Sequence, residues 1–380
     1  MHQIFYPSFA FQHSCFTYTL SKKTRYDKKY KKMNLKVKAP LLLNWYDTNA
    51  REMPWRISPS DRIAGVTPDP YHVWLSEIML QQTTVATVKS YFIKFISKWP
   101  TLEKLAQADE GEVTGAWAGL GYYARARNLL KCAKIVSSDY GGKFPSDYKT
   151  LIKLPGVGPY TAGAIASIAF DKKEVVVDGN VERVISRLFD IKIPLPESKK
   201  EITKIAKNLT PSVRPGDYAQ AVMDLGATVC TPISPKCLVC PLQQHCLSYK
   251  NGSQNLVPYK RKKEKKPTRY GYMYIVKRTD DAYLLERRPD KGLLAGMLGW
   301  PTSEWSQNPE ESPPIISEWK TYRTKIRHTF THFHLEITLK TAFVNLNCKP
   351  KRGFFALVGE FNSSELPTVF KKAFDVHQEA

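Results

Sequence analysis

Hydrophobic residues between positions 40 and 230 recur at intervals of three and four, the spacing that predicts amphipathic helices. The clearest case is a helix that begins close to Asp178. One face of it would be lined by Val181, Val184, Ile185 and Leu188. The same spacing predicts the other helices of this region: one around Leu41–Tyr46, then Tyr71–Lys98, shorter segments between 101 and 140, Pro159–Phe170 and Tyr218–Val229. Residues 57–70 contain prolines and a glycine and predict a loop.

The pattern changes after Thr268 to short segments rich in β-branched and aromatic residues, which predict strands. These segments are Tyr270–Lys277, Ala282–Arg287, His334–Val344 and Phe354–Val358. The chain is therefore expected to be mainly α, with a smaller mixed α/β domain at its end. The expected divisions are a basic arm over 1–39, a helical domain over 40–250, a linker over 251–267 and the α/β domain over 268–380.

The size and charge of the chain narrow the class of protein. Its 380 residues suffice for two domains with cores, and no apolar run reaches the length of a membrane span. A formal charge of +22 indicates a polyanionic partner, most often nucleic acid. Two basic segments stand out, the arm and the run 260–267. We expect the arm to be disordered; it has the composition of an organelle transit peptide, and Met33 is an alternative start.

Glu77 stands in the predicted helix 71–98 among apolar neighbours. On a helix it would share one face with Val73, Leu80 and Thr84. A carboxyl in such surroundings is desolvated, which raises its pKa and lets it donate a proton near neutral pH. The simpler interpretation is a glutamate at the margin of the apolar face that reaches water or an arginine.

A glycine turn at residues 154–159, reading LPGVGP, precedes the predicted helix 159–170. Gly156 and Gly158 around Val157 permit a tight turn with unshielded backbone amides, and Pro159 suits a first helical position. Alanines would leave the helix slim enough for another backbone or a ligand to approach closely. The segment is similar to the helix-hairpin-helix motif of DNA-binding proteins, whose amides would hold a phosphate. An ordinary helix-helix turn explains these residues equally well.

Asp178 lies where the helix over 178–188 is expected to begin, and either it or Asn180 would serve as a plain N-cap. The chemical interpretation uses the same geometry, because a helix N-terminus stabilises negative charge and would keep Asp178 ionised beside a developing cation. One carboxyl kept protonated by burial and a second kept ionised is the division of roles found in cleavage of glycosidic bonds.

Four of the seven cysteines are clustered, at Cys230, Cys237, Cys240 and Cys246. This clustering indicates a metal site in a reducing compartment, not a disulfide framework. Four thiolates in one loop can bind zinc or ligate a 4Fe-4S cluster. A zinc ribbon usually shows two Cys-x-x-Cys pairs and this segment has one, but the spacing alone leaves the metal open.

A second glycine turn, at residues 119–121, is followed by Tyr122 and Tyr123 and then by Arg125 and Arg127. Aromatic side chains beside cations suit stacking on nucleic-acid bases or insertion between them. A tyrosine pair is more often part of a core, so this signal is weak by itself.

Together, these motifs closely resemble those of the MutY-type adenine DNA glycosylases, a family of the helix-hairpin-helix superfamily that also contains endonuclease III. The resemblance extends from about Leu41 to Phe374 and depends on the order and spacing of six segments. They are VWLSEIMLQQT around Glu77, AGLGYYARARNL, LPGVGPYTAGAI, VVVDGNVERV, MDLGATVCTP with the four cysteines, and HTFTHFHL at 328–335.

The resemblance implies a monofunctional enzyme, expected to be a monomer, that removes adenine mispaired with 8-oxoguanine or guanine in duplex DNA. The adenine must first be flipped out of the stack. Glu77 is implied to protonate its imidazole ring, and Asp178 to stabilise the oxocarbenium ion by a route that can include a covalent sugar intermediate. Tyr160 and Asn180 match residues that support this site by hydrogen bonding.

The remaining site residues follow from the same resemblance. Gln82 and Tyr122 match residues that wedge into the duplex opposite the flipped base, and the amides of Gly156, Val157 and Gly158 would hold phosphate. The four cysteines match the ligands of a 4Fe-4S cluster, which favours iron over zinc.

The second domain resembles the Nudix-like module with which this family senses 8-oxoguanine. Phe330, Thr331 and His332 match its base-sensing loop, with threonine where serine is usual. No Arg-Glu-x-x-Glu-Glu arrangement follows Gly292, so we expect recognition without pyrophosphate hydrolysis. The short linker lacks the cysteines of a zinc site in animal homologues. It favours a bacterial or organelle-type enzyme over a vertebrate-like nuclear one. The expected location is the bacterial cytoplasm, associated with the nucleoid, or the mitochondrion or nucleus if the source is a eukaryote.

Three other functions compete with this prediction. An endonuclease III-like glycosylase with lyase activity would need a lysine where Tyr160 stands. A lesion-binding protein without catalysis would bind mispairs and release no adenine. A Nudix hydrolase would need the signature that the second domain lacks.

Overall fold

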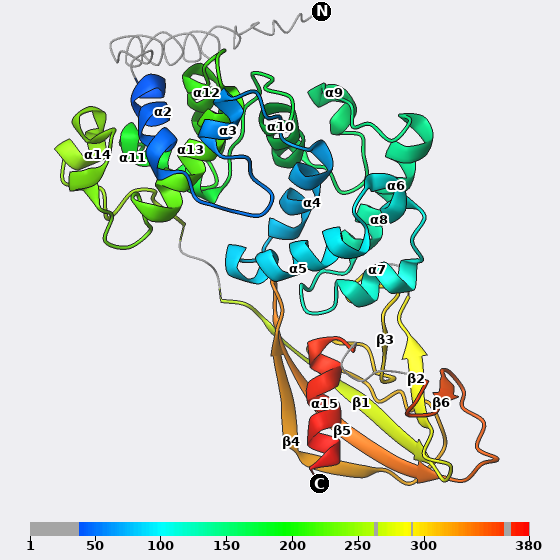
Figure 1. Ribbon diagram of the computed structural model, residues 1–380. Helices are drawn as coiled ribbons and strands as arrows, with labels where there is room; N and C mark the ends of the chain where they lie inside the picture. Colours follow the sequence, from blue (N-terminus) through cyan, green and yellow to red (C-terminus); the bar gives the residue numbers. More distant parts are fainter. Residues whose placement is uncertain (1–37, 262–264, 290–291, 361–365, 380) are drawn as a thin grey trace, which may run out of the picture. The chain divides into compact units, whose positions relative to one another are not determined.

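The computed structural model describes residues 38–261, 265–289, 292–360 and 366–379, and the chain divides into two compact units (Figure 1). The first comprises the chain up to residue 107 together with 129–261; the second comprises 108–128 and 262–380. Most of the expected basic arm, with Met33, and part of the run 260–267 lie outside the described residues. No helix in the described ranges is long and apolar enough to cross a membrane.

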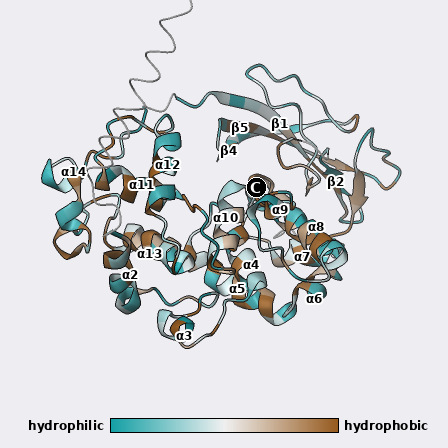
Figure 2. Ribbon diagram, turned by 90° about the horizontal axis from the view of Figure 1, so that it is seen from above, coloured by the Kyte–Doolittle hydropathy of each residue, from teal (hydrophilic) through white to brown (hydrophobic). Residues whose placement is uncertain are grey.

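The first unit is built from helices, as the sequence predicts. They are α2 (Lys38–Asn49), α3 (Pro59–Ile63), α4 (Pro70–Leu80), α5 (Val85–Lys98), α6 (Leu102–Ala106), α8 (Ala124–Asp139, which starts in the second unit), α9 (Tyr148–Leu151), α10 (Pro159–Ile168), α11 (Gly179–Leu188), α12 (Lys199–Leu209), α13 (Pro215–Thr228), the short 3-10 helices η2 (Cys237–Val239) and η3 (Gln243–His245), and α14 (Leu247–Lys250). Hydrophobic and hydrophilic residues alternate along them (Figure 2), as expected of helices that bury one side.

The single helix expected over 71–98 is in fact two helices, α4 and α5. The chain breaks between them because Gln82 adopts a positive φ of 60° and the hydroxyl of Thr84 caps α5. Thr84 therefore does not share the helical face of Glu77, and that prediction was wrong. The loop expected over 57–70 contains the short helix α3, which begins at a proline, a residue suited to a first helical position.

The helices α9 and α10 and the turn between them form the expected hairpin. Gly156 has a φ of 75°, which residues with a Cβ rarely adopt. Gly158 occupies the N-cap of α10, and Pro159 is its first residue. No side chain caps this helix, so the amides of its first turn have neither an intrahelical partner nor a side-chain cap.

α10 packs closely against the segment that leads into α11. A Cβ on Gly163 would lie 2.6 Å from the carbonyl oxygen of Val175, so only glycine fits there without a shift. This is the close backbone approach that the small residues of α10 predict. α13 contacts both α10 and α11 and holds the two helices in one core.

The second unit contains a mixed sheet with the helices α7 (Glu110–Ala116) and α15 (Thr368–Gln378). Its strands are β1 (Thr268–Arg278), β2 (Tyr283–Arg287), β3 (Leu298–Gly299), β4 (Lys320–Thr329), β5 (His334–Val344) and β6 (Phe354–Ala356). The strand order is β3-β2-β1-β5-β4, with β6 also paired to β2. β1 and β5 run parallel, and the other pairs are antiparallel.

One face of the sheet packs beneath α15, which Figure 1 shows lying along the strands. Ile337 and Leu339 of β5 meet Val369 and Phe370 of α15 in the same buried cluster. The four expected strands are present, whereas β3, β4 and α15 were not predicted. β4 lacks the alternation of a half-buried strand, because Ile326 is the one buried residue in it.

We predict that Gly163→Ala lowers the free energy of unfolding by about 1–3 kcal/mol, because the added methyl group must displace the backbone at Val175. Thermal unfolding followed by circular dichroism measures this. Gly115→Ala is the control: Gly115 also lies in a helix but has nothing within 4 Å of an added Cβ, and its change should stay within about 1 kcal/mol. Equal effects of the two substitutions would contradict the close approach.

Candidate active site

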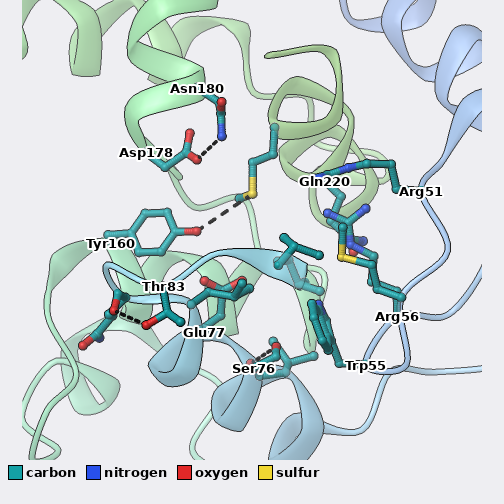
Figure 3. A pocket seen from close by; sticks show the side chains of 17 residues that line it. Arg51, Trp55, Arg56, Ser76, Glu77, Thr83, Tyr160, Asp178, Asn180 and Gln220 are labelled. Atoms are coloured by element: carbon teal, nitrogen blue, oxygen red, sulfur yellow. Dashed lines mark hydrogen bonds between the residues drawn. The ribbon is translucent and has the colours of Figure 1, made fainter. Parts of the chain in front are cut away.

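A cavity of about 300 Å³ in the first unit brings the four residues expected to carry the chemistry together. Glu77 comes from the last turns of α4, Tyr160 is the second residue of α10, and Asp178 and Asn180 stand at the start of α11. Figure 3 shows Glu77, Tyr160 and Asp178 pointing into this space from three separate elements. Residues that are about 100 positions apart in the sequence thus form one site.

The carboxyl of Glu77 is buried, with only 7% of the residue exposed. Its Oε2 atom has no hydrogen-bond partner among the described residues. Burial raises the pKa of Glu77 to about 7; the Tyr160 phenol and the Arg56 guanidinium act to lower it, and the charge of Asp178 adds to the rise. Glu77 therefore carries a proton in a substantial fraction of molecules at neutral pH.

Tyr160 faces the same cavity but offers no amine. Burial and the neighbouring carboxylates of Glu77 and Asp178 raise the pKa of its phenol well above the usual value, so the phenol stays protonated. Its hydroxyl donates to Sδ of Met223 over 3.9 Å. No lysine is among the described residues that line the cavity. A Schiff base with a sugar has no nucleophile here.

Asp178 is the N-cap of α11, as the sequence predicts. Its Oδ1 accepts from the amide of Val181 over 2.7 Å, and its Oδ2 accepts from the side-chain amide of Asn180 over 2.9 Å (Figure 3). Arg183 in turn donates to Oδ1 of Asn180 over 2.8 Å and to the carbonyl of Cys230 over 2.7 Å. These bonds fix the Asp178 carboxylate at a helix N-terminus that favours its negative charge.

The cavity also contains polar residues that the sequence analysis missed. Arg51 and Arg56 both bind the fully buried Asp224, over 2.6 and 2.8 Å, and both line the cavity. Gln220 of α13 lines it too. Gln220 gave a usable signal, because it is a polar residue in a helix whose residues from Pro215 to Gly226 are all buried and mostly apolar. The pairing of Arg56 with Asp224 links residues too distant in sequence to be found from a local pattern.

The residues expected to touch DNA in the first unit lie at surface turns. Gln82 is exposed in the break between α4 and α5. Gly156 and Gly158 form the hairpin turn; Val157 between them buries its side chain, and its amide donates to the carbonyl of Leu154 over 3.1 Å.

The residues expected to read the opposite base line a cavity of about 770 Å³ within the second unit. Tyr122 is 55% exposed and has a positive φ of 51°. Its hydroxyl lies 3.1 Å from that of Thr331, which stands with His332 in the hairpin loop between β4 and β5. Phe330 closes this loop with a hydrogen bond from its amide to the carbonyl of Phe333.

The four clustered cysteines surround a small cavity that Arg187 also lines. In the described ranges, no three His, Cys, Asp or Glu side chains converge closely enough to hold a single metal ion. The buried Arg187 donates to Sγ of Cys230 over 3.4 Å and to carbonyls on both sides of the loop. Cys230, Cys237, Cys240 and Cys246 thus fit a 4Fe-4S cluster, which when bound cross-links four points of the loop.

Comparisons with known proteins agree with this geometry. Residues 75–212 match the profile of the HhH-GPD superfamily of base excision DNA repair proteins, residues 230–246 match the iron-sulfur binding domain of endonuclease III, and residues 272–376 match a NUDIX domain. A thermostable thymine-DNA glycosylase of known structure is 31% identical and superposes with a TM-score of 0.51 over 58% of this chain and 99% of its own. The class of protein is therefore a base excision DNA glycosylase with a 4Fe-4S cluster.

Full-length relatives narrow the class to a family. The adenine DNA glycosylase of Homo sapiens is 35% identical over 89% of this chain and 73% of its own. The adenine DNA glycosylase of Buchnera aphidicola from Schizaphis graminum is 36% identical over 80% of this chain and 87% of its own. The chain belongs to the adenine DNA glycosylase family.

We predict that Arg187→Met lowers the iron content of the purified protein at least twofold, because the carbonyls that its guanidinium binds and Sγ of Cys230 lose their donor. Iron and acid-labile sulfide per chain measure this. Lys250→Met, at an exposed position in α14 nearby, is the control and should retain full content. Full occupancy in Arg187→Met would show that the thiols hold the cluster without this support.

Proposed function

We propose that this glycosylase excises adenine paired with 8-oxoguanine or guanine in duplex DNA by hydrolysis alone, with Glu77 as the general acid and Asp178 as the stabilising anion. The observation that carries the proposal is the meeting of one buried, proton-bearing carboxyl and one helix-capping carboxylate in a single cavity without a lysine.

The first step needs a proton on the departing base. Adenine is a poor leaving group as an anion, and protonation of its imidazole ring lets it depart neutral. Glu77 is suited to this role because burial keeps its proton available near pH 7. The base must be flipped out of the duplex to reach the cavity, where Arg56 and Gln220 provide hydrogen-bonding groups for its edge.

The second step leaves positive charge on the sugar. A carboxylate on the opposite side of the cavity stabilises an oxocarbenium ion, directly or as a covalent adduct, until water attacks. Asp178 suits this role because the amide of Val181 and the side chain of Asn180 hold its oxygens in place. Because the described residues that line the cavity include no lysine, the expected product is an abasic site on an uncut strand.

Recognition of DNA requires contacts on both strands. The uncapped amides at the start of α10 suit a phosphate, and Gln82 and Tyr122, both exposed with positive φ, suit insertion into the base stack. 8-Oxoguanine differs from guanine by a carbonyl at C8 and an N–H at N7. The hydroxyl of Thr331 can donate and accept, and with His332 it supports recognition of these atoms in the second unit's cavity.

An adenine-release assay tests the substrate. Under single-turnover conditions we expect release from duplexes with adenine opposite 8-oxoguanine and opposite guanine, and none opposite thymine. Absence of release from the two mispairs would refute the proposed substrate.

We predict that Glu77→Gln and Asp178→Asn each lower the rate of adenine release by at least about 10²-fold. Glu77→Gln removes the proposed proton donor, and Asp178→Asn removes the proposed stabilising anion. Both substitutions keep the size of the side chain, so mismatch affinity should change little. Binding to a mispaired duplex, measured in parallel by fluorescence anisotropy, serves as the control for folding. Wild-type rates in either variant would refute that residue's role.

The rate should fall as pH rises above about 7, because the reaction requires protonated Glu77 and burial sets its pKa near that value. The groups that face Glu77 are Tyr160, Arg56 and Asp178. The charge of Arg56 lowers the pKa of Glu77, so Arg56→Met should raise that pKa. The falling limb of the single-turnover pH profile should therefore move to higher pH. A shift toward acid, or none, would contradict the assignment of that limb to Glu77.

A further inference from the structure

A row of cations follows β4, the edge strand of the sheet in the second unit. Lys325 and Arg327 alternate in the regular part of the strand, so their side chains project from the same face. Arg323 is exposed in the bulge that interrupts the pairing between Thr321 and Lys325. Tyr322 and Ile326 project from the other face and pack against the core beneath α15. Lys325 and Arg327 therefore lie on the face of the sheet that α15 does not cover, and Arg323 is exposed on the same edge strand.

The strand pairing places polar and aromatic residues beside this row. Arg327 lies opposite Glu336 of β5, and Lys325 lies opposite Thr338. Two rows of residues cross the sheet from β4 through β5 to β1. One row is Arg327, Glu336 and Tyr270, and the other is Lys325, Thr338 and Tyr272. This part of the face thus presents cations at its edge and tyrosines behind them.

In these rows Arg327, Lys325 and Tyr270 are exposed and the other three residues are half-buried, whereas the adjoining part of the same face is covered. There the amide of Ser312 donates to the hydroxyl of Tyr274 over 2.9 Å, and the ring of Trp319 packs on Tyr274. By contrast, the side chain of Arg327 is 80% exposed and Tyr270 is 42% exposed.

The charge of the row is largely uncompensated. Within the described residues, Arg323 and Lys325 have no acidic partner, and Lys325 donates only to the hydroxyl of Thr338. Arg327 pairs with Glu336 over 3.2 Å. An exposed pair of this kind contributes little, and the guanidinium retains further N–H donors.

β4 ends at Thr329 and continues directly into the loop with Phe330, Thr331 and His332. We propose that Arg323, Lys325 and Arg327 bind the phosphates of the duplex strand whose base this loop reads. The regular strand from Lys325 to Arg327 rises roughly 7 Å, a length that matches about two nucleotides of duplex DNA along the helix axis, and Arg323 extends the row of cations. The inference depends on the proposed reading function of the loop.

Duplex DNA is the occupant that the chemistry favours. The protein belongs to a family of DNA glycosylases and carries a formal charge of +22, and phosphate contacts from exposed Arg and Lys position such proteins without reading sequence. An acidic protein surface would fit the same charges, and single-stranded DNA would fit the tyrosines. An unchanged salt slope is the outcome that would indicate the first, and a single-strand arm tests the second.

The test combines Arg323→Gln, Lys325→Gln and Arg327→Gln in one full-length protein that contains its cluster. The matched control removes three exposed cations elsewhere in the unit, by Lys349→Gln, Lys351→Gln and Lys371→Gln. Binding is measured against KCl concentration in a Glu77→Gln background, with duplexes carrying adenine opposite 8-oxoguanine, opposite guanine and opposite thymine, and with the single strand.

We expect the slope of log affinity against log salt concentration to fall by about 2–3 in the β4 variant, since each phosphate contact contributes about 0.9. The loss should be equal for the three duplexes, and release of adenine at saturating DNA, measured with Glu77 present, should stay within about twofold of wild type. The control variant should keep the wild-type slope.

Three outcomes would overturn the proposal. An unchanged slope would show that the row binds a partner other than DNA. A loss of affinity confined to the 8-oxoguanine duplex, or one confined to the single strand, would also contradict it.

Failure of the underlying function is detected separately. If the wild-type protein bound 8-oxoguanine and guanine duplexes equally, the reading role of the loop would fail while the slope of the β4 variant stayed measurable.

Discussion

The site depends on the burial of one carboxyl group in a cavity that also contains an anion. Removing the Glu77 carboxyl from water disfavours its charged form, and the nearby charge of Asp178 acts in the same direction. The surroundings of the two carboxyls therefore differ, and the proposed roles follow from that difference. Arg56 acts to lower the pKa of Glu77 and is itself held by the fully buried Asp224. The cavity therefore limits how far the pKa of Glu77 rises.

The anion is positioned by the ends of several elements. Asp178 caps α11, and Asn180 binds its second oxygen. Arg183 then ties Asn180 to the carbonyl of Cys230, the first cysteine of the cluster loop. A cluster bound by the four cysteines would stiffen the far end of this connection.

The sequence predicted the residues of the site better than their surroundings. Asp178 was identifiable because helical periodicity begins directly after it, and the cysteines because their spacing is local. The break at Gln82 depends on a positive φ that no glycine or proline announces. The pairing of Arg56 with Asp224 joins residues 168 positions apart, and β4 buries one residue only, so neither leaves a local pattern. These features follow from tertiary packing.

The most direct test of the account is the pKa of the Glu77 carboxyl itself. Infrared difference spectra of wild-type protein and Glu77→Gln, recorded across pH, isolate the carbonyl stretch of this one protonated side chain. The account predicts that the band disappears with a midpoint at about pH 7. A midpoint near 4.3, the value of an exposed glutamate, would contradict the claim that burial makes Glu77 an acid at neutral pH.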